Sequence, residues 1–422
     1  MRILIKDTII LHPDAEPSQG LQSILIEDGI ITEIKSKISA KVDKIIESGN
    51  SFTSSGWVDV GTNIGEPGYE HREDIESVTK AAAAGGYTML LSSPNTLPVT
   101  QSKSDVLFIK QKSEDKITNI RPMGALSIDC LGKDMTEMFD LHDGGAVAFT
   151  DGAKSIQDSG FLKRALEYVQ AFDGLVLHSP INGAFQTGWQ MHEGLVSTSL
   201  GMKGIPPVAE EMMVGRDIKL LQYTGGKLHL YNISTLQSVD LIRKAKKQGL
   251  NISCSVPVMN LCFDDDALMG FDSNFKVTPP LRTSDHRLAL LKGVQEGVID
   301  FVTSNHTPIE HDLKELEFPY AKFGVIQLET AYSILATLAS KKITPQLVAG
   351  LFSHQPRKIF GLHQPEIKTG EMAELTVFDP DITWVYESGN ILSKSKNNPM
   401  VGKKLSGKTI ATIRGKRIFA QQ

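Results

Sequence analysis

Polar residues that could do chemistry stand directly after short apolar runs in the middle of the chain. The first run, GWVDV, passes into a glycine-rich turn. There Gly61 and Asn63 occupy the two positions at which an H-x-H pair would hold a metal ion. The equivalent positions after later runs are Asn95, Asp151, His178, Asn232, Asn305 and His306. The set is rich in neutral amides and contains one carboxylate and two imidazoles.

Two interpretations of the ionisable residues remain open. Zinc takes three or four imidazole, thiolate or carboxylate ligands, and an asparagine oxygen is a weak ligand for this ion. Asp151 and His178 could form a metal site with only these two protein ligands. Alternatively, hydrogen bonds satisfy them as ordinary polar groups, which we favour because two ligands seldom suffice. His306, which stands close to Pro308, could orient a loop or contact a ligand, and His229 fits an ordinary buried histidine.

Composition excludes several classes of protein. The formal net charge is −5, with lysine and arginine scattered along the chain, which argues against a nucleic-acid partner. The three cysteines form no C-x-x-C pair, as suits a reducing compartment. The N-terminal run carries charges that defeat a signal peptide, and no window approaches a membrane span. Neither G-x-S-x-G nor a P-loop occurs. We expect a cytoplasmic protein with no nucleic-acid or membrane partner.

The elements that must position these residues alternate between strands and helices. Eight short apolar runs stand at residues 56–61, 87–93, 120–127, 146–150, 174–178, 227–232, 251–256 and 299–304. Helical patterns lie between most of them, such as EDIESVTKAAAAG and SGFLKRALEYVQAF. This alternation predicts a (β/α)8 barrel, with function at the carboxyl ends of the strands. A doubly wound sheet is the alternative, but its glycine-rich fingerprint is missing.

Both ends of the chain read as β structure. The runs RILIKDTIIL and SILIEDGIITEIK alternate apolar and polar residues, and EDG between two such runs indicates a hairpin. The runs AELTVFDPD, ITWVYES and KTIATIRGKRIFA near the C-terminus have the same character. Neither end alone has enough strand for a core. We therefore predict one small β-sandwich module from residues 1–53 plus 364–422, and a barrel from residues 54–363.

Long motifs give the chain a family resemblance. They are EPGYEHREDIESVTKAAAAGGYTMLLSSPNTLPV, SLGMKGIPPVAEEMMVGRDIKL, PPLRTSDHRLAL, FGVIQLETA and GEMAELTVFDPD. Together they resemble dihydroorotases of the amidohydrolase superfamily, over essentially the whole chain. The resemblance implies an amidohydrolase-type barrel, usually homodimeric. Such a barrel uses metal to open and close the cyclic amide between carbamoyl aspartate and dihydroorotate in pyrimidine biosynthesis.

The resemblance assigns the metal ligands residue by residue. The H-x-H pair of the family falls on Gly61 and Asn63. The bridging acidic ligand is retained as Asp151, in AFTDG, and the next histidine ligand is retained as His178. The histidine of the AHVST motif falls on Asn232, in YNIST. Three of the five positions therefore carry a residue that cannot replace the family ligand.

The substrate and proton-transfer positions are also altered. The substrate-binding arginine falls on Gly65, and the catalytic aspartate of TDHAPH falls on Asn305. The last histidine of that motif falls on Ile309, whereas Asn95, in PNT, is retained. Amide hydrolysis here needs a metal-activated water and a base, and asparagine cannot exchange a proton near neutral pH.

We interpret the chain as a catalytically inactive, dihydroorotase-like protein that needs no cofactor. Some family members without metal ligands associate with aspartate transcarbamoylase, so we expect a structural partner of that enzyme. One alternative is an active dihydroorotase, or another cyclic amidohydrolase, with an unusual or reduced zinc site. A weaker alternative is a neutral asparagine-lined pocket for an uncharged ligand. We further expect Gly61→His, Asn63→His, Asn232→His and Asn305→Asp together to rebuild the ligands and the base.

Overall fold

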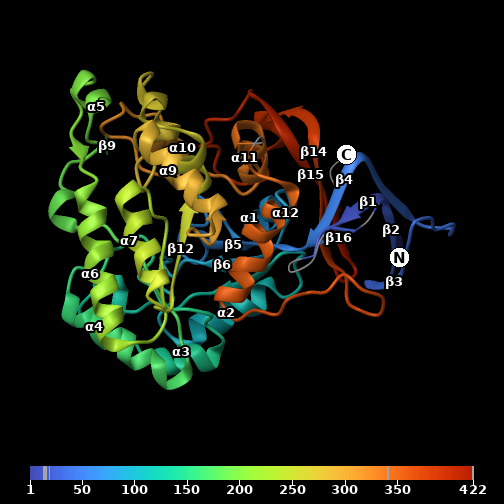
Figure 1. Cartoon of the computed structure of the whole chain (residues 1–422), viewed down its shortest axis with the longest axis horizontal. Helices are drawn as coiled ribbons and strands as arrows, with labels where there is room; N and C mark the ends of the chain where they lie inside the picture. Colours follow the sequence, from blue (N-terminus) through green and yellow to red (C-terminus); the bar gives the residue numbers. More distant parts are fainter. Residues whose placement is uncertain (13–16, 19, 340–341, 421–422) are drawn as a thin grey trace.

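The computed structural model describes residues 1–422 except 13–16, 19, 340–341 and 421–422. Parts of the expected terminal module, and two residues of the expected barrel, therefore lie outside the described residues. Figure 1 shows a helix-rich body on the left and a sheet on the right, with both ends of the chain at the sheet. The sheet has seven strands in the order β16-β15-β14-β4-β1-β2-β3. Both ends of the chain therefore build one module, as predicted, but its strands pair in one sheet, whereas we predicted a β-sandwich.

The strands of this terminal sheet alternate because only one of their faces meets a core. The apolar core beneath it includes Ile3, Ile5, Ile24 and Ile413. The hairpin predicted at EDG is confirmed, since Asp28 and Gly29 have φ of 48° and 88° between two antiparallel strands. The bounds are β1 Arg2–Ile10, β2 Gln22–Glu27, β3 Ile30–Lys35, β4 Lys44–Ser55, β14 Glu374–Val385, β15 Lys404–Arg414 and β16 Arg417–Ala420.

Parallel strands form the wall of the predicted barrel. They pair in the orders β5-β6-β7 and β13-β12-β11-β8. Their bounds are β5 Trp57–Thr62, β6 Tyr87–Ser92, β7 Asn119–Pro122, β8 Val176–His178, β11 Leu228–Leu230, β12 Ile252–Pro257 and β13 Phe301–Thr303. β5 and β6 are buried along their whole length because the wall is covered on both faces, which explains their continuous apolar runs.

The run at 146–150 departs from the sequence prediction of a regular strand. It forms only single bridges, which join Phe149 to Gly124 on one side and to Val176 on the other. Its backbone N–H groups still donate alternately to the segments on its two sides. Val147 N donates to Pro122 O at 3.2 Å, and Phe149 N donates to Leu175 O at 3.0 Å. This irregular segment therefore links the two strand groups and takes the fourth place in the barrel wall.

Asp59 closes the barrel between its first and last strands. One carboxylate oxygen of Asp59 accepts from Ser304 N at 2.7 Å, and the other accepts from Ser304 Oγ at 2.7 Å and from Thr62 Oγ1 at 2.5 Å. Just above, Asn63 N donates to His306 O at 3.1 Å. Complete burial raises the pKa of Asp59, although these hydrogen bonds oppose the shift. These hydrogen bonds hold the carboxyl ends of β5 and β13 side by side.

Helices surround the barrel and cap themselves locally. In the first barrel helix, Asp74 accepts from Ser77 N at 2.7 Å, and Ser77 Oγ accepts from Asp74 N at 3.1 Å, which is a capping box. The helices are α1 Ile75–Ala84, α2 Lys103–Ser113, α3 Met138–Gly144, α4 Ser159–Tyr168, α5 Leu195–Ser199, α6 Val208–Thr224, α7 Leu236–Lys247, α8 Val258–Cys262, α9 Ser284–Gln295, α10 His311–Lys314, α11 Ala331–Ala339, α12 Pro345–Ala349 and α13 Gln355–Ile359. Two short strands, β9 Met191–His192 and β10 Gly204–Ile205, pair beside α5.

The barrel and the terminal sheet share a buried junction. The Trp57 ring stacks on the Phe352 ring, with centroids 5.2 Å apart, and contacts the Phe378 ring of β14, with centroids 5.3 Å apart. Beside it, the fully buried Arg357 of α13 pairs with Glu374 of β14. Arg357 also donates to Gly56 O at 3.0 Å. The ion pair therefore joins the end of the barrel to the sheet at the point where the chain crosses between them.

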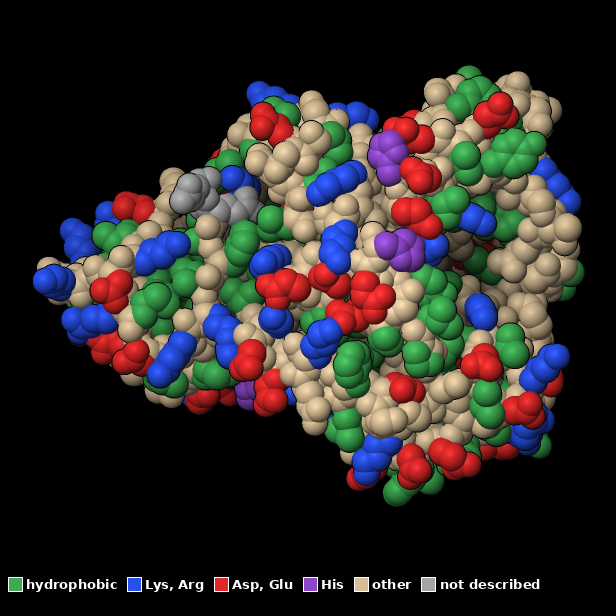
Figure 2. All heavy atoms as spheres, turned by 180° about the vertical axis from the view of Figure 1, so that it is seen from behind, with side chains coloured by type: hydrophobic (Ala, Val, Ile, Leu, Met, Phe, Trp, Pro, Cys, Tyr) green, Lys and Arg blue, Asp and Glu red, His purple; other side chains and the backbone are tan. Residues whose placement is uncertain are grey.

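Lysine and arginine lie among aspartate and glutamate on the face shown in Figure 2, without a continuous basic area. This agrees with the scattered charges of the sequence. Among the described residues, no helix is both long and apolar enough to cross a membrane.

We predict that Arg357→Met destabilises the protein strongly, because it leaves the Glu374 carboxylate buried without its partner. The expected loss in free energy of unfolding is about 3–5 kcal/mol. Denaturant unfolding should show that the double variant Arg357→Met/Glu374→Leu recovers most of this loss. A single variant as stable as the wild type would contradict the role of the pair.

Candidate functional site

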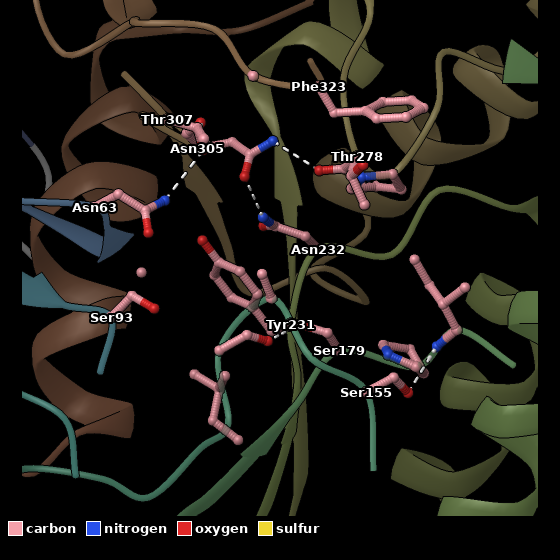
Figure 3. Close-up of a pocket in the computed structure, with 18 of the residues that line it drawn as sticks. Asn63, Ser93, Ser155, Ser179, Tyr231, Asn232, Thr278, Asn305, Thr307 and Phe323 are labelled. Atoms are coloured by element: carbon pink, nitrogen blue, oxygen red, sulfur yellow. Dashed lines mark hydrogen bonds between the residues drawn. The ribbon is translucent and has the colours of Figure 1, made fainter. Parts of the chain in front are cut away.

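A cavity of about 420 Å³ opens at the carboxyl ends of the barrel strands. Figure 3 shows its wall, in which side chains from opposite sides of the barrel converge. Four of the residues singled out from the sequence line it, namely Gly61, Asn63, Asn232 and Asn305. The other five, Gly65, Asn95, Asp151, His178 and Ile309, are not part of its lining within the described chain. The barrel thus brings together the neutral positions.

The asparagines bond to one another and to the backbone. Asn232 Nδ2 donates to Asn305 Oδ1 at 3.1 Å, and Asn232 Oδ1 accepts from Thr303 Oγ1 at 2.7 Å. Asn305 Nδ2 donates to Thr278 O at 3.0 Å. Asn63 Nδ2 donates to Thr307 Oγ1 at 3.1 Å (Figure 3). This network connects the ends of β5, β11 and β13 with the loop at Thr278, without a formal charge.

Backbone conformation favours asparagine at two of these positions. Asn232 and Asn305 have φ of 58° and 54°, in the left-handed region. Among residues with a side chain, asparagine and aspartate enter this region most readily. The sites therefore accept a neutral amide without additional backbone strain.

Tyr231 occupies the space next to Gly61. A Cβ built on Gly61 would lie 2.0 Å from the Tyr231 hydroxyl oxygen, and Gly61 has a φ of +80°. The hydroxyl donates to Val60 O at 3.1 Å across the barrel. Tyr231 was not among the candidate residues named from the sequence. The available signal was the YNIST segment itself, since alanine precedes the histidine in the family motif AHVST and the larger tyrosine stands there in this chain.

The two retained ligand residues have other partners. His178 Nε2 accepts from Ile156 N at 2.9 Å, and His178 Nδ1 donates to Asp217 Oδ2 at 2.5 Å. Both ring nitrogens are thus engaged. The Asp151 carboxylate accepts from both the backbone N and the hydroxyl of Ser127. Burial raises the pKa of Asp151, partly offset by these hydrogen bonds.

The remaining singled-out positions are held by packing and by loop contacts. A Cβ on Gly65, which has a φ of +72°, would meet Glu73 O at 2.2 Å. Asn95 Oδ1 accepts from Ser93 Oγ at 2.7 Å and from Ala153 N at 3.0 Å, which fixes the loop after β6. Ile309 is 7% exposed and packs close to Gly324.

The two other histidines noted in the sequence are structural. His229 is fully buried, hydrogen-bonds to Ser253 and Ser255 and stacks on Phe301 at 4.8 Å, as expected for a core residue. His306 Nδ1 accepts from Gln327 N at 3.2 Å, which ties it to the loop before α11. Neither lines the cavity.

These donors do not fit the zinc ion that the family resemblance implies. Among the described residues, no group of three or more histidine, cysteine, aspartate and glutamate side chains is arranged to hold a metal ion. The space at Gly61 is filled, and the His178 lone pair is engaged by Ile156 N. Our expectation that four substitutions would rebuild the ligands and the base meets an obstacle, because the Tyr231 ring occupies the space that a side chain at position 61 would need.

A parallel (β/α)8 barrel with a polar mouth and a sheet built from both termini defines the amidohydrolase type of fold. Solved structures agree on the fold. The L-hydantoinase (dihydropyrimidinase) from Arthrobacter aurescens superposes with a TM-score of 0.86, at 21% identity, over 99% of this chain and 96% of that one. The dihydropyrimidinase from Brevibacillus agri gives a TM-score of 0.82, at 19% identity, over 100% and 95%. The predicted fold class is confirmed.

Sequence relatives define the family more narrowly. A family model described as dihydro-orotase-like matches residues 52–238. A dihydroorotase from Carboxydothermus hydrogenoformans is 37% identical over 98% of this chain and 96% of its own length. A dihydroorotase from Acetivibrio thermocellus is 37% identical over 97% of both chains. The chain belongs to the dihydroorotase family, as its motifs predict.

We predict that burial of His229 makes the fold sensitive to acid. Burial lowers the pKa of His229 from 6.5 to about 3. The unfolded chain therefore binds this proton first, and stability falls as the pH drops from 6.5 toward 3. The contribution is about 1.4 kcal/mol per pH unit.

The variant His229→Gln should lack this contribution while keeping polar contacts to the two serines. Its free energy of unfolding, measured by denaturant titration, should approach that of the wild type as the pH falls below 6.5. A constant difference between pH 7 and pH 4 would contradict a neutral buried imidazole.

Proposed function

We propose that this member of the dihydroorotase family is catalytically inactive and acts as a structural partner of aspartate transcarbamoylase, as a cytoplasmic homodimer. The observation that most supports a loss of catalysis is the position of the Tyr231 hydroxyl, which occupies the space that a side chain at position 61 would need. A metal-assisted hydrolase needs an open ligand position and a proton acceptor beside it. Asn305 fills the acceptor position with a group that does not titrate near neutral pH.

Exposed apolar side chains around the barrel mouth support a role in assembly. Leu195 of α5 is 89% exposed, and Met212 of α6 is 53% exposed. Val208 of α6 and Leu288 of α9 are also exposed. Burying apolar side chains of this size against another protein lowers the free energy of the complex. The choice of aspartate transcarbamoylase comes from the family resemblance.

The second candidate is an active dihydroorotase or another cyclic amidohydrolase with a reduced zinc site. The dihydroorotases at 37% identity over nearly the full length favour it. It requires that Asp151 and His178 release their present partners to reach a metal ion.

Metal content and activity separate the two candidates. Protein purified without chelator should contain no stoichiometric zinc. It should show no turnover of carbamoyl aspartate or dihydroorotate above background, with or without added zinc. Zinc bound at one ion per chain, together with turnover that Asp151→Ala abolishes, would establish the active enzyme.

A reconstruction experiment tests the role of Tyr231 directly. The triple variant Gly61→His/Asn63→His/Asn232→His should not retain zinc, because the tyrosine ring blocks the new side chain at position 61. Adding Tyr231→Ala should increase the zinc content per folded chain, measured by elemental analysis after gel filtration. Equal zinc retention with and without Tyr231→Ala would show that the ring is no obstacle.

The assembly role predicts a specific interface. Aspartate transcarbamoylase should co-elute with this protein on gel filtration at micromolar concentration, as expected for an interface of about 1,200 Å² or more. Leu195→Asp/Met212→Asp should release it. Ile45→Asp, at an exposed position on the terminal sheet, is the matched control. Independent elution of the wild-type proteins, with unchanged transcarbamoylase stability, would refute the partnership.

A further inference from the structure

A second cavity lies between the barrel and the terminal sheet, separate from the barrel mouth. Its volume is about 280 Å³, slightly below the range of about 300–1,000 Å³ that is usual for drug-sized ligands. Helices α1 and α11 pack against β15 in this part of the molecule (Figure 1). The residues that line the cavity are Ala84, Glu329, Trp384, Tyr386, Asn390, Leu392, Lys408 and Phe419. None of these residues lines the cavity at the barrel mouth.

Lys408 of β15 contributes an ammonium group to this cavity from the side of the terminal sheet. Its Nζ atom lies 5.6 Å from the centre of the Trp384 ring. Within the described part of the chain, no hydrogen bond or ion pair engages this ammonium group. Burial lowers the pKa of Lys408, because the charged form loses hydration. An anionic group of a ligand can therefore pair with Lys408.

Glu329 contributes a carboxylate to the same cavity from the side of the barrel. It stands in the loop before α11, and its oxygens accept from Leu392 N at 3.1 and 3.2 Å and from Ser393 N at 3.3 Å. Across the described residues, no lysine or arginine forms an ion pair with Glu329. Burial raises the pKa of Glu329 to about 7, although these hydrogen bonds oppose the shift. A ligand cation beside Glu329 would stabilise the ionised carboxylate.

Aromatic rings form much of the remaining wall. Trp384, Tyr386 and Phe419 all line the cavity. The rings of Trp384 and Tyr386 lie nearly perpendicular, at 82°, with centroids 5.7 Å apart. Trp384 Nε1 donates to Gly407 O at 3.0 Å, which fixes the indole ring. Faces of such rings pack against a methylene chain and attract an ammonium group.

We propose that this cavity binds a small zwitterion, in which a short aliphatic chain joins an ammonium group to a carboxylate. The ammonium group of the ligand pairs with Glu329, and its carboxylate pairs with Lys408. A simple anion would leave Glu329 without a cation, and a simple cation would leave Lys408 without an anion. The site therefore discriminates against molecules that carry only one of the two charges. This binding function is independent of the barrel mouth and of the partner protein.

A series of unbranched amino acids tests the proposal on the wild-type protein. Glycine, β-alanine, 4-aminobutanoate and 5-aminopentanoate differ in the separation of their two charges. Isothermal titration calorimetry should show saturable binding of at least one of them with a Kd below about 5 mM. Its two analogues that lack either the ammonium group or the carboxylate should bind at least about tenfold more weakly. If no amino acid of the series binds, or if an analogue with one charge binds as tightly, the proposal is wrong.

Two variants locate the site. Lys408→Met removes the ammonium group, and Glu329→Gln removes the negative charge but keeps an acceptor for Leu392 N. Each should weaken binding of the best amino acid by about tenfold or more. The matched controls Lys404→Met, on the same strand, and Glu387→Gln, shortly after β14, lie at exposed positions and should bind like the wild type. Unchanged binding in the cavity variants, or equal loss in the controls, would overturn the assignment.

Discussion

The hydrogen bond from the Tyr231 hydroxyl to Val60 O is the constraint on which the rest of the barrel mouth depends. The phenol ring of Tyr231 therefore extends from the end of β11 across the barrel to β5. Gly61 must then lack a side chain, because a Cβ there would meet the hydroxyl. An imidazole at position 61 would require this ring to move. The ring also forms one boundary of the cavity, which stays open beyond it.

The buried charges at the mouth are stabilised by hydrogen bonds from the protein itself. A buried carboxylate without a cation is costly unless several donors hydrogen-bond to it. Asp59, Asp151 and Glu210 each accept from at least one backbone N–H and a serine hydroxyl, so each is stabilised by the protein itself. At Asn232 and Asn305 the chain has neutral amides in the left-handed conformation. Each of these buried carboxylates is therefore satisfied within the protein.

Most of the architecture could be predicted from the sequence, since it follows local rules. Period-two alternation and the EDG turn determine the terminal strands, and alternating apolar runs and helical patterns determine the barrel. The segment at 146–150 is the exception. Its hydrogen bonds alternate between Pro122 on one neighbour and Leu175 on the other, and regular pairing of this kind depends on two partners distant in sequence. Local pattern alone cannot show whether such pairing stays regular.

The sequence by itself determined the family, the barrel and the identity of every residue at the altered ligand and base positions. Only the tertiary structure decided what those residues do. In the folded chain both ring nitrogens of His178 form hydrogen bonds, Asn95 lies outside the cavity wall, and Tyr231 lies against Gly61. Motifs align positions along the chain, whereas occupancy of space depends on side chains that arrive from strands far apart in sequence. Tyr231 and Gly61 are 170 positions apart, and the barrel closure brings them into contact.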